Sequence, residues 1–582
     1  MNLRNYLLST LFICASTFLV PAQTKWVNPL VDTPNGIHGQ YWQGEIKGSY
    51  VRLPDRVRSK VRDDVWNLSR HSAGLSIVFR SNAPEIKVRY GVTGGLCWSQ
   101  MPSTGVSGID LYATDLNGGR HWCSGNFTFG DTISYTYSNL TYDTKDRGYE
   151  YHLYLPLYNG VKWLEIGVPE HNQLVFEPAS VEKPIVVYGT SIAQGACASR
   201  PGMAWTNIIE REMEHPIINL GFSGNGKLEP ELFDILSEID AKLYIIDCMP
   251  NLFGEASAVI YDRAVNGVHR LREKHSTPIL LVEHSGYTNY ETNIKKEESF
   301  RKANLELKRA YNALKKEGIK DIYYMTHEEI GLTMDDMVEG IHPSDLGMRK
   351  HADNYSKKIK EILHEDCEKR TVFTPCKQQR DWYDWNDRHE AILKMNRMKS
   401  PDILLIGNSI THFWGGEPTF SIVNGKDAWD NLFKGKNVRN LGFGWDRIEN
   451  ALWRIYHGEL DGFKAKKIFL LMGTNNLDIN SNEEIVCGIQ ELVRAIRFRQ
   501  PEAHIYVCGI LPRNGKDYRI TQINKSLQMR LQPDEMTFVD MSPTLSNPDG
   551  YINKSLFTDG THPNAEGYKR MAEILKQYVN EP

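Results

Sequence analysis

Two serines, each followed about 150 residues later by a histidine, are the residues of this chain best placed to do chemistry. Asp559 stands three residues before His562, and an acid at this spacing can hold the imidazole in one tautomer while its other nitrogen takes the proton of Ser409. An Asp-x-x-His pair alone is also typical of a surface ion pair or of half a metal site. No second His or Cys stands nearby at ligand spacing, so the pattern favours acyl transfer by a serine, with no metal and no cofactor.

The serines need further companions before they can be interpreted as nucleophiles. A lone Ser at a strand-to-helix turn is more often a helix N-cap, although backbone N–H groups at such a turn can stabilise an oxyanion. The segment Gly-Thr-Asn-Asn at 473–476 follows an apolar strand and directs the amide of Asn475 towards the same sheet edge. Neither Ser lies in Gly-x-Ser-x-Gly, which argues against an ordinary α/β-hydrolase elbow.

The same landmarks occur twice along the chain, which indicates an internal duplication. Three pairs of motifs keep the same order and comparable spacing: Gly189-Thr190-Ser191-Ile192 with Gly407-Asn408-Ser409-Ile410, Asn219-Leu220-Gly221-Phe222 with Asn440-Leu441-Gly442-Phe443, and His342-Pro343 with His562-Pro563. Each half is about one domain long between its Ser and its His.

The hydrophobic pattern divides the chain into one β-rich and two α/β parts. Residues 26–181 alternate apolar and polar with period two between short turns, which predicts an all-β sandwich or jelly roll. After Pro184, and again from Ile403, continuous apolar strands alternate with amphipathic helical stretches, as in parallel sheets covered by helices. The predicted domains are 23–181, 182–366 and 381–582, with a linker at 367–380.

The second α/β part resembles the SGNH/GDSL esterase family, close to its platelet-activating-factor-acetylhydrolase-like branch. Four blocks carry the resemblance: 407–410, 440–446, 473–476 and 559–562. The resemblance implies a flavodoxin-like parallel sheet, Ser409 as nucleophile, His562 as base and Asp559 as the acid that orients it. It also implies an oxyanion hole of Asn475 and backbone N–H groups at Gly444 and Trp445, where Trp445 replaces the family's glycine.

The first α/β part resembles a related branch whose members carry a β-sandwich with a Gly-x-Asp-Leu-Tyr motif, here at 108–112. The implied triad is Ser191, His342 and Glu339, in which Glu replaces the usual Asp. The implied oxyanion donors are Gly224 and Asn251.

The N-terminus predicts export. Arg4 precedes an apolar run that ends in Val-Pro-Ala at 20–22, which is typical of a cleaved signal peptide over 1–22. The run is too short for a membrane anchor, and no later segment is long enough. Lipidation of Cys14 is disfavoured by the bulky residues before it. The exported protein is expected in the periplasm or the medium, where Cys97 with Cys123 or Cys367 with Cys376 could pair, although sequence alone does not decide pairing.

Export, the appended β-sandwich and a resemblance to exported carbohydrate esterases that join such a sandwich to an SGNH domain imply the substrate. The chain is expected to be an exported serine esterase that removes small acyl groups, O-acetyl above all, from polysaccharides. The net charge of −4 gives no basic footprint for nucleic acid. Two alternatives stay open: a lipid esterase or lysophospholipase, and a chain in which one unit is a sugar-binding pseudoenzyme. Four aromatic residues of the β-rich part could stack on sugar rings or could belong to its core: Tyr41, Trp42, Trp98 and Trp122.

Overall fold

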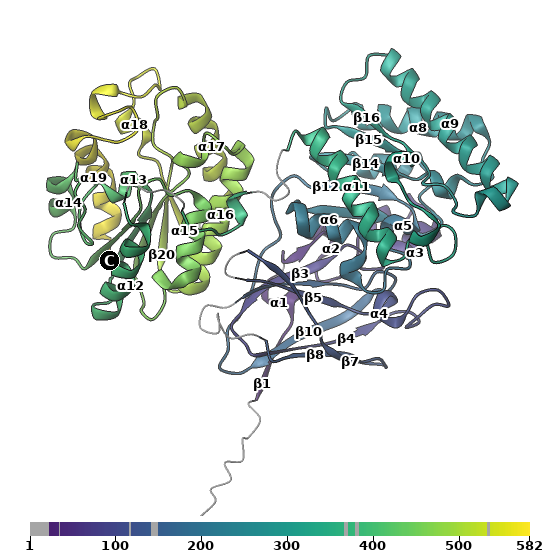
Figure 1. Ribbon diagram of the computed structural model, residues 1–582, viewed down its shortest axis with the longest axis horizontal. Coiled ribbons are helices and arrows are strands. Elements are labelled where there is room, and N and C mark those ends of the chain that lie inside the picture. Colours follow the sequence, from purple (N-terminus) through teal and green to yellow (C-terminus); the bar gives the residue numbers. More distant parts are fainter. Residues whose placement is uncertain are drawn as a thin grey trace, which may run out of the picture.

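The structure is a computed structural model that describes residues 23–33, 35–115, 118–140, 149–365, 371–378, 383–531 and 536–581. An antiparallel β domain is followed by two α/β domains with parallel sheets, which confirms the predicted fold class (Figure 1). The predicted signal peptide, with Cys14, and the predicted partner Cys367 lie outside the described residues. Cys97 and Cys123 are both unbonded.

Two antiparallel sheets form the N-terminal sandwich. One has the order β1-β10-β4-β8-β7 and the other β11-β3-β9-β5-β6, with β2 beside β3. Ile86, Val88 and Tyr90 alternate into the core from β4, as the period-two pattern predicts. The strands are β1 Thr24–Val27, β2 Ile37–His38, β3 Ser76–Ser81, β4 Glu85–Val92, β5 Asp110–Thr114, β6 Arg120–Cys123, β7 Asn126–Thr128, β8 Ile133–Ser138, β9 Tyr149–Tyr154, β10 Val161–Pro169 and β11 Leu174–Phe176.

Residues 42–66 of the N-terminal domain, in short helices and the segments between them, complete the core of the first α/β domain. Trp42, Leu53 and Trp66 belong to the same buried cluster as Tyr188 and Phe233 of that domain. The helices are α1 Pro29–Asp32, α2 Gln43–Ile46, η1 Asp55–Val57, α3 Asp63–Ser69 and α4 Ser103–Val106. The sandwich and the first α/β domain are therefore joined by a shared hydrophobic core.

The first α/β domain has a parallel sheet of order β13-β12-β14-β15-β16. Its strands are β12 Ile185–Gly189, β13 Ile217–Gly221, β14 Leu243–Asp247, β15 Ile279–Val282 and β16 Ile322–Met325. Its helices are α5 Ser191–Gln194, η2 Pro201–Met203, α6 Trp205–Met213, α7 Pro230–Leu236, η3 Met249–Leu252, α8 Ser257–Arg272, η4 Tyr290–Thr292, α9 Ile294–Lys316, α10 His327–Ile330, η5 Met334–Asp336 and α11 Asp345–Leu363.

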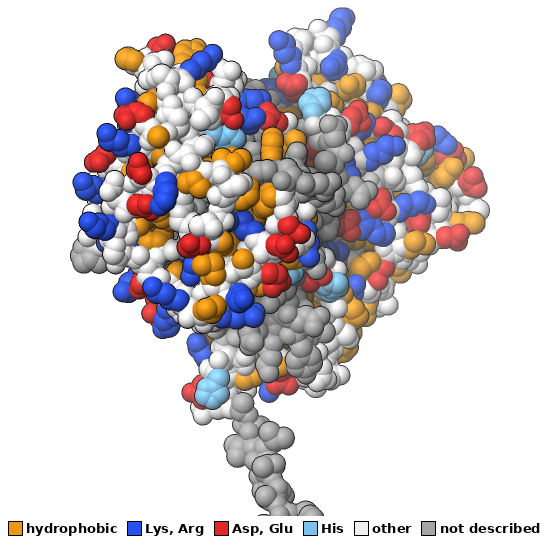
Figure 2. All heavy atoms as spheres, turned by 60° about the vertical axis from the view of Figure 1, so that its left-hand side comes forward, with side chains coloured by type: hydrophobic (Ala, Val, Ile, Leu, Met, Phe, Trp, Pro, Cys, Tyr) orange, Lys and Arg blue, Asp and Glu red, His pale blue; other side chains and the backbone are white. Residues whose placement is uncertain are grey.

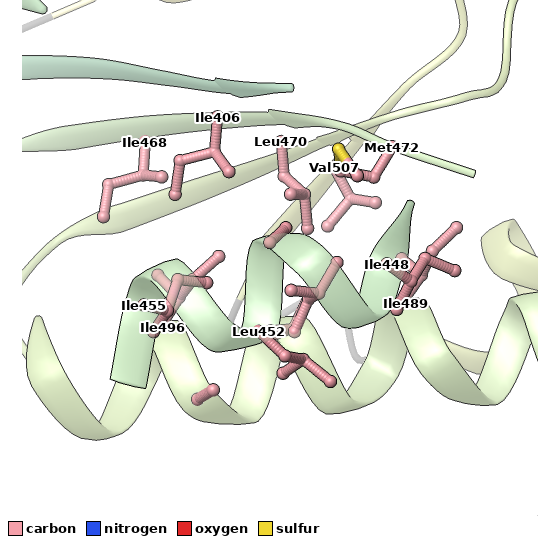
Figure 3. Packing of buried hydrophobic residues seen from close by; sticks show 14 of the residues in the cluster. Ile406, Ile448, Leu452, Ile455, Ile468, Leu470, Met472, Ile489, Ile496 and Val507 are labelled. Atoms are coloured by element: carbon pink, nitrogen blue, oxygen red, sulfur yellow. The ribbon is translucent and has the colours of Figure 1, made fainter. Parts of the chain in front are cut away.

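The second α/β domain repeats this order as β18-β17-β19-β20-β21. Figure 3 shows its core, in which Leu470 and Val507 of the sheet face Leu452 of α15 and Ile489 of α16. The strands are β17 Ile403–Gly407, β18 Val438–Gly442, β19 Lys467–Leu471, β20 His504–Cys508 and β21 Met536–Val539. The helices are α12 Trp385–Met398, α13 Ser409–His412, α14 Lys426–Leu432, α15 Ile448–Arg454, η7 Ile455–Glu459, η8 Thr474–Asn476, α16 Asn482–Arg499, α17 Asp517–Arg530, α18 Ser542–Leu545, η9 Lys554–Leu556 and α19 Ala565–Asn580.

Part of the predicted linker packs against the second α/β domain. Helix η6 (Thr371–Phe373) places Val372 in the buried cluster of that domain. Gln378 donates from Nε2 to the carbonyl oxygen of Gly444 at 2.9 Å. Residues 371–378 are therefore packed on the second α/β domain and do not form an extended linker between the domains.

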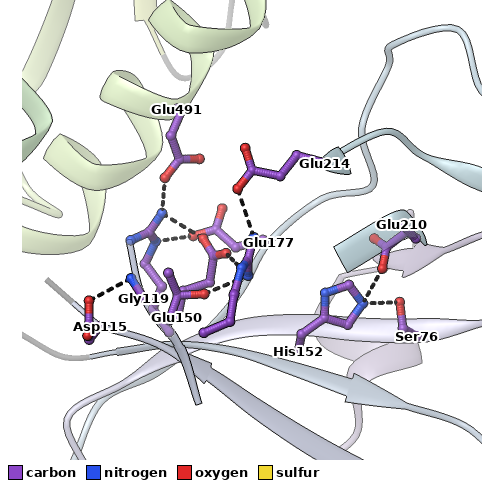
Figure 4. A network of polar contacts seen from close by, with 12 residues as sticks. Ser76, Asp115, Gly119, Glu150, His152, Glu177, Glu210, Glu214 and Glu491 are labelled. Carbon is purple, nitrogen blue, oxygen red and sulfur yellow. Dashed lines mark hydrogen bonds and ion pairs between the residues drawn. The ribbon is translucent and has the colours of Figure 1, made fainter. Parts of the chain in front are cut away.

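The second α/β domain also contacts the sandwich through buried charges (Figure 4). Arg80 of β3 forms ion pairs with Glu150 and Glu177 of its own domain and with Glu491 of α16. A cavity of about 890 Å³ adjoins this contact, and its lining includes none of the predicted triad residues. On the face in Figure 2, charged side chains of both signs are interspersed. Over the described residues no helix is long and apolar enough to cross a membrane.

Candidate active sites

Both predicted nucleophiles begin a helix just after the strand that comes first along the chain in their domain. Ser191 is the first residue of α5, which comes after β12 along the chain. Ser409 is the first residue of α13, which comes after β17. Thr190 and Asn408 cap these helices through their side chains. This strand-to-helix turn lies at the carboxyl edge of a parallel sheet, where α/β folds bind ligands.

The second domain brings Ser409, His562 and Asp559 together in a hydrogen-bonded line. Nε2 of His562 lies 2.8 Å from Oγ of Ser409, and Nδ1 lies 2.6 Å from Oδ2 of Asp559. The other carboxylate oxygen of Asp559 accepts from the backbone N–H groups of Thr561 and His562 at 2.9 and 2.8 Å. Burial alone would raise the pKa of the Asp559 carboxyl, but these hydrogen bonds and that of the imidazole lower it below its usual range.

The first domain forms the same line with a glutamate as the acid. Oγ of Ser191 lies 2.8 Å from Nε2 of His342, and Nδ1 of His342 contacts Oε1 of Glu339. The longer side chain of Glu339 therefore reaches the imidazole from the same sequence position. Asp336, a nearby carboxylate, pairs instead with Lys350 and caps its own turn.

The loops that carry the two histidines have the same conformation. Met337 and Pro343 form an isolated antiparallel β-bridge, and Phe557 and Pro563 form the equivalent one. In each loop the backbone N–H four residues before the His donates to the His carbonyl oxygen, at 2.9 Å in the first domain and 2.8 Å in the second. In each loop this hydrogen bond and the β-bridge stabilise the extended conformation of the His, which the following proline favours.

The turns after β13 and β18 place one residue of each domain in the left-handed region. Gly224 has φ 69° and the equivalent Trp445 has φ 65°. Glycine adopts this conformation freely, whereas an L-residue with a Cβ pays about 1–2 kcal/mol there. The backbone of Trp445 thus follows the path of the glycine, and its indole is half-exposed.

In each domain the residue before Gly224 or Trp445 donates its backbone N–H to a side chain. That side chain lies three residues after the nucleophile. Oε1 of Gln194 accepts from the N–H of Ser223 at 3.0 Å, and Nδ1 of His412 accepts from the N–H of Gly444 at 3.0 Å. Burial lowers the pKa of His412 to about 2, so the ring is neutral and able to accept. The N–H of Gly444 is therefore directed to His412, and Trp445 is the main-chain position equivalent to Gly224.

The two asparagines predicted for the oxyanion hole follow the third strand of each sequence unit. Nδ2 of Asn475 donates to the carbonyl oxygen of Asp446 at 2.9 Å, which anchors the amide on the turn. The orientation of the Asn251 amide that satisfies its neighbours has Oδ1 accepting from Asn225 and Gly226 at 2.9 and 3.0 Å. Both amides are thus tied to the turn that carries Gly224 or Trp445.

Sequence reasoning missed four side chains that support these turns: Arg52, Gln194, Arg388 and His412. The signal for Gln194 and His412 was their common position three residues after the serine in the duplicated motif. No local signal marked the arginines, since they lie in unrelated segments. Among described residues, Glu283, His327 and Glu328 also bring possible metal-ligand atoms within 4.8 Å of one another, and none of them belongs to a triad.

Comparison with known proteins agrees with this architecture. Residues 24–174 match the GxDLY domain, described as the N-terminus of SGNH-hydrolase-type esterases, and residues 182–360 and 405–570 each match a GDSL-like lipase/acylhydrolase family. A solved GDSL-like lipase from Bacteroides ovatus is 31% identical, covers 59% of this chain and 98% of its own, and has a TM-score of 0.54. Platelet-activating factor acetylhydrolase IB subunit alpha2 of Rattus norvegicus is 29% identical over 200 residues, 34% of this chain and 83% of that protein. The chain belongs to the GDSL/SGNH family of acylhydrolases.

Proposed function

We propose that the chain is an exported esterase with two catalytic centres that removes O-acetyl groups from carbohydrates. The observation that carries the catalytic part is the line of Ser Oγ, His Nε2 and a carboxylate on His Nδ1, which occurs in both domains with an Oγ to Nε2 distance of 2.8 Å. Two independent copies of this geometry favour two working sites over one site and one pseudoenzyme.

In the proposed reaction the serine Oγ attacks the ester carbonyl while Nε2 of the histidine takes its proton. Nδ1–H of the ring donates to Glu339 or Asp559, which stabilises the imidazolium. The negative charge on the carbonyl oxygen is met by the N–H of Gly224 or Trp445 and by the Asn251 or Asn475 amide. The imidazolium then protonates the leaving alcohol. Water, activated by the same histidine, hydrolyses the acyl-enzyme to acetate and free serine.

The acetyl group is supported by the rat relative, whose name makes it an acetylhydrolase. The carbohydrate is supported by two partly exposed indoles, one linked to the first nucleophile through Tyr158 and one on the turn after β18. Trp98, 41% exposed, packs edge-on against Tyr158 at 4.3 Å between ring centres, and the Tyr158 hydroxyl donates to the Ser191 carbonyl oxygen. Trp445, 49% exposed, is part of the turn after β18 that carries the proposed oxyanion donors of the second site. Such faces stack on sugar rings, whereas Trp42 is buried in the core.

The experiment is acetate release from acetylated xylan, pectin and glucomannan by wild type, Ser191→Ala and Ser409→Ala. Each single variant should keep the activity of the other site, and the double variant should lose at least about 10³-fold. Trp98→Ala in the Ser409→Ala background should raise KM for the polymer at least about tenfold and leave hydrolysis of a chromogenic acetyl ester unchanged. Absence of acetate release from every polymer, with turnover of the chromogenic ester, would refute the carbohydrate part alone.

A second candidate is an acetyl ester of a phospholipid, which the name of the rat relative favours. The same triads would serve, but this substrate would need an apolar surface for the acyl chain. Vesicles that contain platelet-activating factor distinguish the two. Acetate release from them that exceeds release from every polymer would favour the lipid.

A further inference from the structure

We call the turns that carry Gly224 and Trp445 the oxyanion turns. An arginine binds the free edge of the strand before each of them, β13 or β18. Nη1 of Arg52 donates to the carbonyl oxygens of Asn219 and Gly221 at 3.2 and 2.7 Å. In the second domain, Nε of Arg388 donates to Gly442 at 2.8 Å and Nη2 donates to Asn440 at 3.3 Å. Asn219 and Gly221 are the duplicates of Asn440 and Gly442, so the two arginines bind equivalent atoms.

The position of these carbonyls explains why a donor is needed there. β13 and β18 are edge strands of their sheets, so within the described residues one side of each has no neighbouring strand. Carbonyl groups two residues apart on such an edge face the same way and remain without ladder partners. Buried carbonyls require a donor, and a guanidinium supplies several in one plane.

The surroundings of the two guanidinium groups also match. Arg52 lies over the ring of Phe222 at 5.0 Å and Arg388 over Phe443 at 5.4 Å, and these rings are again duplicates. Both side chains are buried, and all their hydrogen bonds in the described structure end on backbone carbonyls. Charge-assisted bonds of this kind hold a backbone more firmly than neutral ones.

The two arginines come from different parts of the chain. Arg388 lies on α12, the helix that directly precedes β17 of its own domain. Arg52 lies in the N-terminal domain, between α2 and η1. The duplication therefore does not account for the match: the N-terminal domain provides for the first site what α12 provides for the second.

Other side chains of the N-terminal domain bind the same region. Nδ1 of His71 lies 3.1 Å from Nε2 of Gln194, which holds the N–H of Ser223 in the oxyanion turn. The carbonyl oxygen of Leu157 accepts a second bond from Gln194 at 3.1 Å. The N-terminal domain thus binds both the edge strand before the turn and the glutamine that holds it.

We propose that Arg52 and Arg388 are positioning residues that hold the two oxyanion turns in place, so that the N-terminal domain is an integral part of the first active site. This inference rests on the proposed ester hydrolysis for its kinetic readout. It assigns the N-terminal domain a role that is separate from any contact with sugar.

The test uses the full chain with one nucleophile at a time. Arg52→Met and Arg52→Lys are made in the Ser409→Ala background, and Arg388→Met and Arg388→Lys in the Ser191→Ala background. With a chromogenic acetyl ester, Met should lower kcat about 10²-fold with little change in KM, because misplaced oxyanion donors act on the transition state. Lys should restore part of kcat. Each Met change placed in the opposite background should leave kcat unchanged.

A matched control is Arg56→Met, four residues from Arg52. Arg56 also ties the N-terminal domain to the first α/β domain, through Glu238, but it lies on the surface away from the turn. It should leave kcat of the first site within about twofold. An unchanged kcat in Arg52→Met would overturn the inference while the proposed function stands.

Amide hydrogen exchange supplies a readout that needs no activity. Residues 219–226 should exchange at least about tenfold faster in Arg52→Met, and residues 440–446 should stay unchanged; Arg388→Met should do the reverse. If neither site hydrolyses any ester, the proposed function fails and exchange still decides the inference. Equal protection of the turn in wild type and variant would refute the inference. Loss of protection throughout the sheet would also refute it, because Arg52 would then stabilise the whole domain and not the turn in particular.

Discussion

At the scale of single residues, the two sites differ in the acid that orients the histidine. Asp559 and Glu339 occupy the same position three residues before the His, and both contact Nδ1. In the first domain the imidazole is bound by the carboxylate that the duplication indicates, and Asp336 is occupied elsewhere. The replacement of Asp by Glu is therefore compatible with a complete triad.

Removing either carboxylate should disable its own site. Asp559→Asn in the Ser191→Ala background and Glu339→Gln in the Ser409→Ala background should each lower kcat by up to about 10⁴-fold, because an amide favours the wrong imidazole tautomer. Steady-state kinetics on a chromogenic acetyl ester measures both. The control is Asp335→Asn, an exposed neighbour of Glu339, which should change kcat less than twofold. A mild effect of Glu339→Gln would show that another group orients His342.

At the scale of elements, β14 ends in a carboxyl group buried under the sheet edge. Asp247 accepts a hydrogen bond from the Tyr355 hydroxyl of α11 at 3.0 Å. Burial raises the pKa of Asp247 to about 7, against a usual value of 3.8. Between about pH 4 and pH 7 the folded protein therefore keeps this carboxyl protonated, whereas the unfolded chain has released the proton.

This linkage predicts a pH dependence of stability with a definite sign. The stability that Asp247 contributes is complete below about pH 4 and is lost as the pH rises to 7, by up to about 1.4 kcal/mol per pH unit. Asp247→Asn should therefore raise the free energy of unfolding at pH 8 by about 2–4 kcal/mol and change it little at pH 4. Thermal unfolding of the two proteins at both pH values measures the difference.

The matched control for this prediction is Asp240→Asn, an exposed carboxylate that pairs with Lys183. Its effect should stay within about 0.5 kcal/mol at either pH. Equal stability of wild type and Asp247→Asn at pH 8 would mean that Asp247 ionises in the folded protein without cost.

At the scale of the whole molecule, one buried arginine connects the first and last thirds of the chain. Arg80 joins Glu177 of the sandwich to Glu491 of α16, and its guanidinium also donates to the Tyr456 hydroxyl at 3.1 Å. Cations buried among carboxylates are costly to remove, because the remaining charges lose their partner. Arg80 thus ties the second α/β domain to the sandwich, together with the ion pair of Arg494 and Glu177.

Arg80→Met should loosen the second α/β domain from the sandwich. The expected cost is about 3–5 kcal/mol, seen as a larger radius of gyration in solution scattering and an earlier thermal transition. The kcat values of both sites on a small ester should be unchanged, since no triad residue contacts Arg80. Arg89→Met, which removes a half-exposed pair with Glu165, is the control and should change neither measurement. An unaltered scattering profile of Arg80→Met would place the stability of the domain contact elsewhere.

Much of the architecture was determined by the sequence alone. Period-two alternation predicted the sandwich, continuous apolar strands predicted the parallel sheets, and repeated motifs around Ser191 and Ser409 revealed the duplication. These features are local in the chain or repeated along it, so composition and spacing report them directly. Spacing also predicted the pair of Asp559 and His562, whereas the nucleophile roles and the part of Glu339 came from the resemblance to the SGNH/GDSL family.

Other features were decided only by the tertiary structure. The sequence places Arg52 in a β-rich domain and gives no reason to connect it with Ser191, yet folding brings it to the strand edge that Arg388 caps in the second domain. The resemblance placed Trp445 at the family's oxyanion glycine and kept Gly444 beside it as a further donor, and only folding showed that the N–H of Gly444 is bound by His412. Such contacts arise where free backbone groups at a sheet edge meet any side chain able to bind them, and this requirement leaves no periodic trace in the chain.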